Sequence, residues 1–482
     1  MLKNIMHKAL VIILFVIPLA SLYAQQSHTL YFMNNVPETN LLNPAVQNEC
    51  KLFIGLPVVS SLHVNLTNSG FTMNQLLINE APGEYSIDAS NIAKKLGRRN
   101  YLSTEAYINL FGFGIRIKNR YYITFNIRER EDFNLFYTKN LFSLAYKGNT
   151  QYEGGWLSLK GNGLQFNHYR EYSLGISKVV DNYRTFGIRT KLLFGKLNFK
   201  TSRDNVDMFT ENNTFDLFFN SDARIDASLP LSLDTVNGNL RVNDQYYPDD
   251  PVQILFNSSN IGFAVDAGLI YRYDEKITFQ ASLLDLGFIK YLTNQTNYTV
   301  QGELLYTGPL GDTIITRNYA WDLFDRINDS MSVSLSREPY TYYLSPRLYL
   351  GVSYRINRTL TGNVLIGSRI MKQKLQSGIT ISGIWRPYNH VAATFSWSFI
   401  HRSINNIGAG LALGRSPVQF YIVSDNVMGF IWPQSTKNIN LRLGLNIILG
   451  CREKFNINNC GCYWLQKAEE RQERRKKRFR KK

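Results

Sequence analysis

The sequence predicts an all-β protein, a transmembrane antiparallel β-barrel of about 14 strands. Three observations support this prediction: long segments alternate between apolar and polar residues, aromatic residues stand at the ends of these segments, and charged residues occur in the middle of their polar faces. The chain has 482 residues, and its 29 Tyr and 29 Phe contrast with only 4 Cys, which excludes a disulfide-dense scaffold. After residue 24 no apolar run reaches about 18 residues, so the sequence does not encode a helical membrane protein.

The alternation is clearest in residues 440–449, where Leu441 and Leu443 fall on one face and Arg442 falls on the other. A soluble β-sandwich with an apolar core would show the same alternation. Strands of about 10 to 15 residues, however, exceed the usual length of about 5 to 6 in globular sheets. Charged residues such as Arg189 and Lys191 on the polar face would also be costly in a dry core. These features favour a barrel with lipid outside and water inside.

Fourteen strands can be placed along the chain, and an even number puts both chain ends on the same side of the barrel. Short turns such as 118–120 alternate with three long connections, 133–168, 201–260 and 291–345, which are expected to be outer loops. The predicted strands are 53–66, 104–118, 120–132, 169–180, 183–200, 261–273, 276–290, 346–357, 358–372, 374–386, 388–400, 404–414, 417–425 and 438–450.

The N-terminal residues 1–24 read as a signal peptide, with basic residues, an apolar stretch and a small residue before a polar start. A membrane-anchor helix is the alternative, but the apolar stretch is short for a span. Residues 25–50 are expected to form a periplasmic lead-in to a barrel at 51–450. Residues 72–97 include a short capped helix, which is interpreted either as a plug of the lumen or as a helical turn in an outer loop.

Several segments together resemble a known family. They are Asn40–Ala45, Phe53–Ser61, Asn68–Phe71, Leu283–Ile289, Pro417–Tyr421 with Asp425 and Asn426, and Asn440–Asn446. The resemblance is to a Bacteroidota outer-membrane barrel family catalogued as a domain of unknown function, which looks like a distant relative of the FadL-type and PorV-type barrels of fourteen strands. It covers about residues 30–450 and implies the fold and the compartment. It transfers no catalytic residues, and the tail after Gly450 departs from it.

The sequence contains no recognisable catalytic or metal-binding motif. The 6 His are scattered, and no metal-ligand spacing, serine-hydrolase elbow or phosphate-binding loop is present. The glycines of residues 408–414 resemble a nucleotide-binding pattern but fall inside a predicted strand. His390 lies near Ser396 and Ser398, and nothing beyond proximity supports a phospholipase pair. We therefore expect a protein without enzymatic activity, cofactor or metal.

The cysteines flank the predicted barrel. Cys50 directly precedes the first strand and Cys451 directly follows the last one, and these strands are neighbours in a closed barrel. A Cys50–Cys451 disulfide across the closure is therefore one hypothesis for an oxidising compartment. Cys460 and Cys462 can compete for Cys50, and free thiols are the remaining alternative.

Residues 451–482 form a Cys-containing basic tail. The formal net charge of the chain is +17, and residues 452–482 contribute 12 Lys or Arg and 4 Glu, a net of +8. A nucleic-acid partner is excluded by the export signal, because the tail is expected in the periplasm. The expected partners are a periplasmic or outer-membrane protein, peptidoglycan or lipid head groups, and a solvated tail is the alternative. The candidate docking residues are Arg471, Arg474, Arg475, Lys476, Lys477, Arg478, Arg480, Lys481 and Lys482.

Two functions are compatible with these features of an outer-membrane barrel whose termini are both periplasmic. The first is a scaffold or accessory subunit of a cell-envelope complex, of the secretion or outer-membrane assembly type, that docks a partner through the basic tail. The second is a FadL-like passive transporter or channel for hydrophobic or small solutes.

Overall fold

The computed structural model describes residues 27–451 except for 82–83, 88, 119, 230–231, 237–238, 244–255, 308–329, 372–373 and 401–402. The predicted signal peptide and nearly all of the basic tail, with Cys460 and Cys462, lie outside the described residues. Of the helices in the described part of the chain, none has the length and hydropathy of a membrane span.

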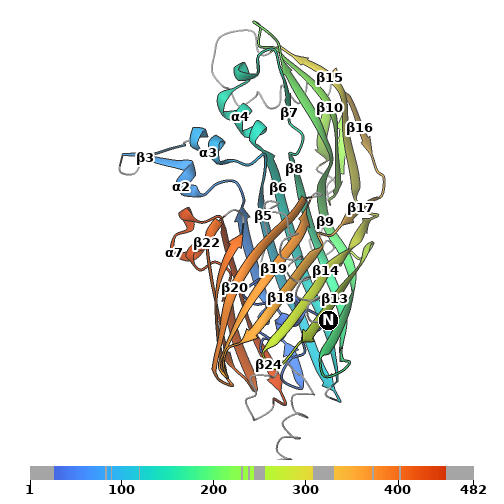
Figure 1. Ribbon diagram of the computed structural model, residues 1–482. Coiled ribbons are helices and arrows are strands. Elements are labelled where there is room, and N and C mark those ends of the chain that lie inside the picture. Colours follow the sequence, from blue (N-terminus) through green and yellow to red (C-terminus); the bar gives the residue numbers. More distant parts are fainter. Residues whose placement is uncertain are drawn as a thin grey trace, which may run out of the picture.

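The strands close into an antiparallel barrel of fourteen positions, which confirms the predicted fold class (Figure 1). The first position is shared by two short strands, and the last strand pairs back with both of them, so no sheet edge is left at the closure. In spatial order the strands are β1 (Leu52–Gly55) with β2 (Leu62–Asn68), β5 (Arg99–Ile117), β6 (Tyr121–Thr138), β8 (Gly163–Val179), β9 (Arg184–Thr210), β13 (Asn260–Arg272), β14 (Ile277–Tyr291), β18 (Arg347–Arg355), β19 (Leu360–Met371), β20 (Lys374–Tyr388), β21 (Val391–Ile400), β22 (Ser403–Gly414), β23 (Val418–Ser424) and β24 (Asn438–Leu449).

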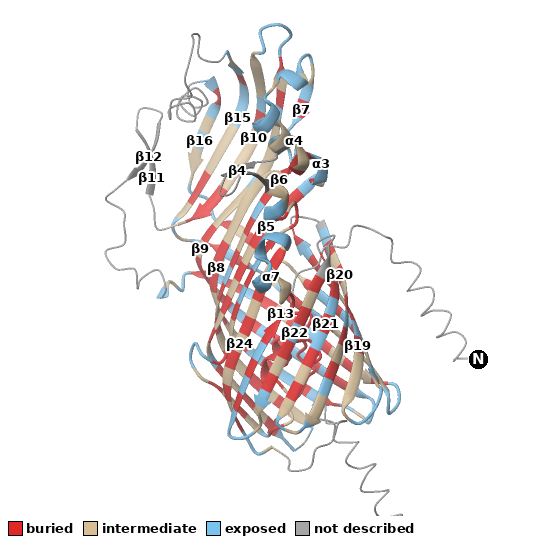
Figure 2. Cartoon of the chain, turned by 90° about the vertical axis from the view of Figure 1, so that its left-hand side faces the viewer, coloured by how far each residue is buried: buried red, intermediate tan, exposed pale blue. Residues whose placement is uncertain are grey.

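The alternation in the sequence becomes the two faces of the barrel wall (Figure 2). On β9, Phe186 and Ile188 face outward and are about half exposed, whereas Arg189 and Lys191 are buried on the inside. Exposed aromatic side chains gather near the short turns, namely Tyr183, Tyr273, Tyr354, Trp385 and Tyr388. An apolar outer surface with aromatic residues at its border is the pattern of a barrel in lipid.

The described parts of the three expected outer loops contain strands that extend the barrel sheet, and this corrects their interpretation as loops alone. β6, β8 and β9 continue beyond the barrel because they keep pairing with one another there, and β9 reaches 27 residues. They form an extension of the sheet at the end opposite the short turns (Figure 1). Its other elements are α4 (Lys139–Lys147), η2 (Thr150–Tyr152), β7 (Trp156–Ser158), β10 (Leu217–Ser228), β15 (Gln295–Tyr306) and β16 (Ser332–Ser336), with β11 (Ser232–Val236) and β12 (Asn239–Asn243) as a separate ribbon and β17 (Tyr340–Tyr343) next to β14.

Residues 72–97 project sideways from the barrel rim, so their interpretation as a lumen plug is wrong (Figure 1). They form α2 (Met73–Leu76), β3 (Leu77–Ala81), β4 (Glu84–Ile87) and α3 (Ala89–Lys95). A hydrogen bond of 2.7 Å from Asn74 Nδ2 to Ser435 Oγ attaches them to the neighbouring α7 (Met428–Ile431) and η4 (Pro433–Ser435).

The lumen is filled instead by residues 27–50, which we call the plug. These residues were expected to form a lead-in outside the barrel, but nearly all of them are buried among its strands, with η1 (Pro37–Leu41) in the middle. Leu30 and Tyr31 belong to a buried apolar cluster with Leu284 of β14 and Tyr349 of β18. The apolar residues at 30–33 drive this placement, because inside the barrel they are removed from water.

Candidate functional site

Polar contacts fix the plug at its beginning and in its middle. The carboxylate of Asp425 accepts hydrogen bonds from the backbone N–H groups of Ser27 (2.6 Å) and Thr29 (2.7 Å). Farther along the plug, Arg189 Nη2 donates to the backbone oxygen and to Oδ1 of Asn40, both at 2.6 Å. The plug therefore has a defined register against the wall.

Inward-facing glycines let the plug approach the wall closely. A Cβ atom at Gly187 would overlap the backbone of Pro44, and one at Gly268 would overlap Asn43 Oδ1. Neither glycine has a positive φ, so what requires glycine here is the space that the plug occupies.

The plug also carries a buried acid. Burial raises the pKa of Glu38 to about 8, although Asn446 Nδ2 donates a hydrogen bond of 2.9 Å to its carboxyl group. Glu38 is therefore mostly protonated at neutral pH.

The wall of the barrel is interrupted next to β14. The interruption begins at a β-bulge, in which Asp266 of β13 faces both Leu284 and Asp285. Asp285 has a φ of +60° and donates its backbone N–H to Asp266 Oδ1 at 2.8 Å. The bulge thereby turns two consecutive side chains inward, Leu284 against the plug and Asp285 into a group of charges.

The neighbour of β14 changes at the bulge. Up to Leu284 the strand pairs with β18, and from Phe288 onward it pairs with β17. Residues 344–346 connect β17 to β18, and within this stretch Leu344 N donates to Gly287 O at 3.0 Å. We call this interruption, residues 285–287 and 344–346, the wall break.

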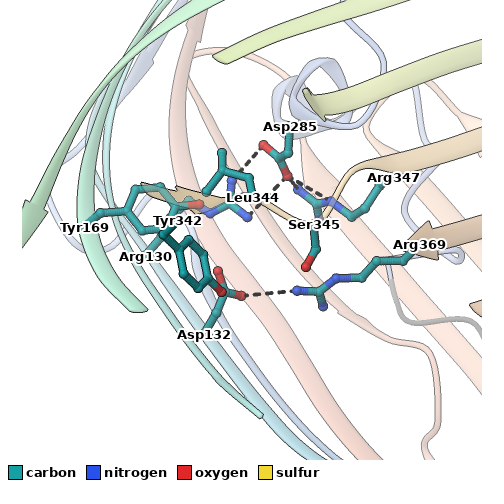
Figure 3. A pocket seen from close by; sticks show the side chains of 9 residues that line it. All are labelled: Arg130, Asp132, Tyr169, Asp285, Tyr342, Leu344, Ser345, Arg347 and Arg369. Atoms are coloured by element: carbon teal, nitrogen blue, oxygen red, sulfur yellow. Dashed lines mark hydrogen bonds and ion pairs between the residues drawn. The ribbon is translucent and has the colours of Figure 1, made fainter. Parts of the chain in front are cut away.

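Charged side chains converge on the inner side of the wall break (Figure 3). Arg347 Nη2 lies 2.5 Å from Asp285 Oδ2, and Arg130 Nη1 lies 3.0 Å from Asp285 Oδ1. Lys191 Nζ reaches the same carboxylate at 2.5 Å and Asp266 at 2.8 Å. Asp285 thus contacts three buried cations, and the buried carboxylates of Asp266 and Glu171 supply further negative charge to Lys191 and Arg130.

Arg369 extends this group of charges across the lumen. It forms an ion pair with Glu105, and its Nη2 lies 3.8 Å from Asp132 Oδ1. Figure 3 shows Arg369 pointing at Asp132 from the opposite wall. We call Glu105, Arg130, Asp132, Asp285, Arg347 and Arg369 the ion-pair layer.

A cavity of about 910 Å³ lies above the ion-pair layer. Its inner lining includes the buried side chains of Tyr101, Phe136 and Met371, whereas Leu286 and Phe288 on its other side belong to the lipid-facing surface. Residues 344–346 of the wall break line it between these two sides. The cavity therefore connects the inside of the barrel with the outer apolar face.

The sequence predicted the cysteine contact but missed the cavity and the ion-pair layer. The structure joins Cys50 and Cys451 in a disulfide between the start of β1 and the end of β24, which was one of the pairings left open. The candidate docking residues of the tail lie outside the described residues, so the tail hypothesis stays a prediction. Within the part of the chain that the structure describes, no three His, Cys, Asp or Glu side chains are grouped to hold a metal ion.

The closed strands, the apolar outer face and the filled lumen define the class of this protein as an outer-membrane β-barrel with an internal plug. The chain belongs to a family of unknown function, DUF5723, whose profile matches residues 44–425. This match confirms the predicted membership of a family of unknown function. The sequence matches no curated protein at a significant level.

Two solved structures are among those to which the chain is similar. The chain is similar to the toluene transporter TodX of Pseudomonas putida, with 9% identity, a TM-score of 0.36 and coverage of 90% of this chain and 96% of that chain. It is also similar to a FadL homologue of Pseudomonas aeruginosa, with 8% identity, a TM-score of 0.34 and coverage of 83% and 91%.

Proposed function

We propose that the protein is a passive transporter that moves small hydrophobic molecules between the extension end of the barrel and the lipid beside it, through the wall break. In this proposal the short turns face the periplasm and the extension faces outward, as is usual for outer-membrane barrels. This is the transport alternative of the two functions considered from the sequence.

The cavity is the observation that supports this proposal. It is lined by side chains of both faces of the wall, so a molecule inside it contacts the barrel interior and the lipid-facing surface together. Below it, the ion-pair layer and the plug occupy the lumen. For a solute that enters from the extension end, the route that stays open therefore leads sideways to the lipid, along Leu286, Leu344 and Ile370.

The size and chemistry of the cavity indicate the kind of solute. Its volume of about 910 Å³ lies within the range of about 300 to 1,000 Å³ that is typical of small-molecule sites. Aromatic and aliphatic side chains form much of its lining, and Arg99, Lys160 and Lys200 add positive charge to its rim. An apolar molecule, with or without an acidic head group, matches this lining better than a cation does.

A substitution that fills the cavity tests the proposal. Ser345 lines the wall break and is half-buried, so Ser345→Trp places an indole in the route. We expect this variant to lose most of the uptake of an apolar fluorescent probe, N-phenylnaphthylamine, by cells that express the protein in their outer membrane. Leu348→Trp is the matched control, because Leu348 lies three residues farther along, faces lipid and is not part of the cavity lining.

Both variants are first checked for folding by the heat-dependent gel mobility that is typical of intact barrels. Uptake by a folded Ser345→Trp variant at the wild-type rate would overturn the proposed route. A loss of uptake in Leu348→Trp that equals the loss in Ser345→Trp would contradict it as well.

A further inference from the structure

The ion-pair layer links opposite walls of the barrel. Arg369 projects from β19, and its partner Glu105 projects from β5. In the spatial order of the strands, β6, β8, β9, β13, β14 and β18 lie between them on one side, and β20, β21, β22, β23, β24 and β1–β2 lie between them on the other. The two residues therefore stand on diametrically opposite strands, so their ion pair crosses the full width of the lumen.

A second contact supports this crossing. Arg130 of β6 reaches Asp285 of β14, and three strands, β8, β9 and β13, lie between these two. Directly above Arg369, Met371 packs against Tyr101 and Phe136 from the opposite wall. Charged and apolar contacts thus hold β19 and β14 to the far side of the barrel at one level.

The plug lies immediately below this level. On β18, Arg347 belongs to the ion-pair layer, whereas Tyr349 packs in the buried apolar cluster that contains Leu30 of the plug. On β19, Arg369 belongs to the ion-pair layer, whereas Gly367 lies against the plug, because a Cβ at this position would overlap His28. Two different sets of contacts therefore obstruct the lumen one above the other.

We propose that the ion-pair layer is a second barrier in series with the plug, so that displacing the plug alone does not open the barrel to ions. A guanidinium group that is paired with carboxylates away from water keeps its geometry, because separating the pair leaves unbalanced charges in a buried place. The barrier therefore depends on the charge of Arg369 and its partners. This inference concerns the lumen and goes beyond the proposed lateral transport, which does not use this path.

The test measures the ion current of the full-length protein in planar lipid bilayers. The plug is loosened by Gly187→Ala with Gly268→Ala, since each new methyl group would overlap the plug while the strand backbone remains allowed. Cleavage after Glu38 by a Glu-specific protease checks that the plug has moved, because Glu38 is buried in the wild-type plug. The ion current of this background is measured only after the check has been passed. The layer is opened by Arg369→Gln, and Arg369→Lys keeps the charge.

We expect closed barrels from the loosened background alone and from Arg369→Gln alone, because one barrier remains in each. Their combination should raise the current by about tenfold or more, and Arg369→Lys in the same background should stay largely closed. Arg272→Gln, which removes another buried arginine outside the layer, is the matched control and should also stay closed.

Either of two results would overturn the inference. In the first, the loosened background alone conducts as well as its combination with Arg369→Gln. In the second, the combination stays closed although protease cleavage shows that the plug has moved. Uptake of the apolar probe by the same variants is measured separately, so a failure of the transport proposal does not affect this result.

Discussion

The Asp285 carboxylate and the Arg347 guanidinium join the two strands that border the wall break, with Oδ2 of Asp285 2.5 Å from Nη2 of Arg347. Asp285 ends the bulge of β14, and Arg347 begins β18 after the interruption. The contact therefore holds the strands together at the point where the ladder of backbone hydrogen bonds changes partner.

Replacing Asp285 by Asn should destabilise the protein strongly. The change removes the carboxylate charge that Arg347 shares with Arg130 and Lys191 in a buried place, and breaking such a pair costs about 3 to 5 kcal/mol. Arg130 then keeps Glu171 as a partner and Lys191 keeps Asp266. Urea unfolding of the detergent-solubilised protein measures the loss. Asp222→Asn is the control, because Asp222 pairs with Arg203 at an exposed site where a change of less than about 1 kcal/mol is expected. Equal effects of the two substitutions would contradict the assigned role of Asp285.

Two glycines of the wall should respond differently to alanine. A Cβ at Gly444 would overlap the carbonyl oxygen of Ser60, in the interruption between β1 and β2, whereas a Cβ at Gly383 meets nothing within 4 Å. Gly444→Ala should therefore lower the free energy of unfolding by about 1 to 3 kcal/mol and reduce the yield of folded barrel. Gly383→Ala should leave both close to the wild-type values. Heat-dependent gel mobility and thermal unfolding distinguish these outcomes.

The Cys50–Cys451 disulfide should contribute to stability at the closure of the barrel. Cys50→Ser and Cys451→Ser should each lower the free energy of unfolding by about 2 to 5 kcal/mol, and the double variant should lose no more than either single one. Thermal unfolding of the wild type with and without a reductant gives an independent measure. Peptide mapping of Cys451→Ser under non-reducing conditions checks whether Cys460 or Cys462 pairs with Cys50 instead. A wild type that is insensitive to the reductant, although its disulfide is reduced, would contradict the prediction.

Glu38 should make the stability of the plugged barrel depend on pH. The pKa of this acid rises from 4.5 to about 8 on burial, so between these values the folded state holds a proton that the unfolded chain has lost. The contribution of Glu38 to the free energy of unfolding is therefore fully present below about pH 4.5 and is lost as the pH rises towards 8. Glu38→Gln should remove this dependence, so its unfolding temperature should gain on the wild type as the pH increases. Glu275→Gln in an exposed turn should follow the wild type at every pH.

The strands and their faces were predictable because lipid outside and polar groups inside impose a period of two on the sequence. The contact between the first and last strands followed from closure, and it brought Cys50 next to Cys451. The plug was missed because Leu30–Met33 carry no strand or helix periodicity, although four apolar residues in a supposed aqueous lead-in were a signal of burial. Contacts across the lumen, such as Arg369 with Glu105, depend on the stagger of all the strands between them, which no local pattern contains.

β9 connects regions of the protein that are otherwise distant. At about 3.3 Å per residue, its 27 residues span roughly 90 Å, several times the height of about 25 Å of the apolar band of such barrels. The same strand carries Arg189 against the plug, Lys200 at the cavity rim and Met208 in the extension. A force that tilts the extension is therefore transmitted along β9 to Arg189, whose hydrogen bonds hold the plug inside the barrel.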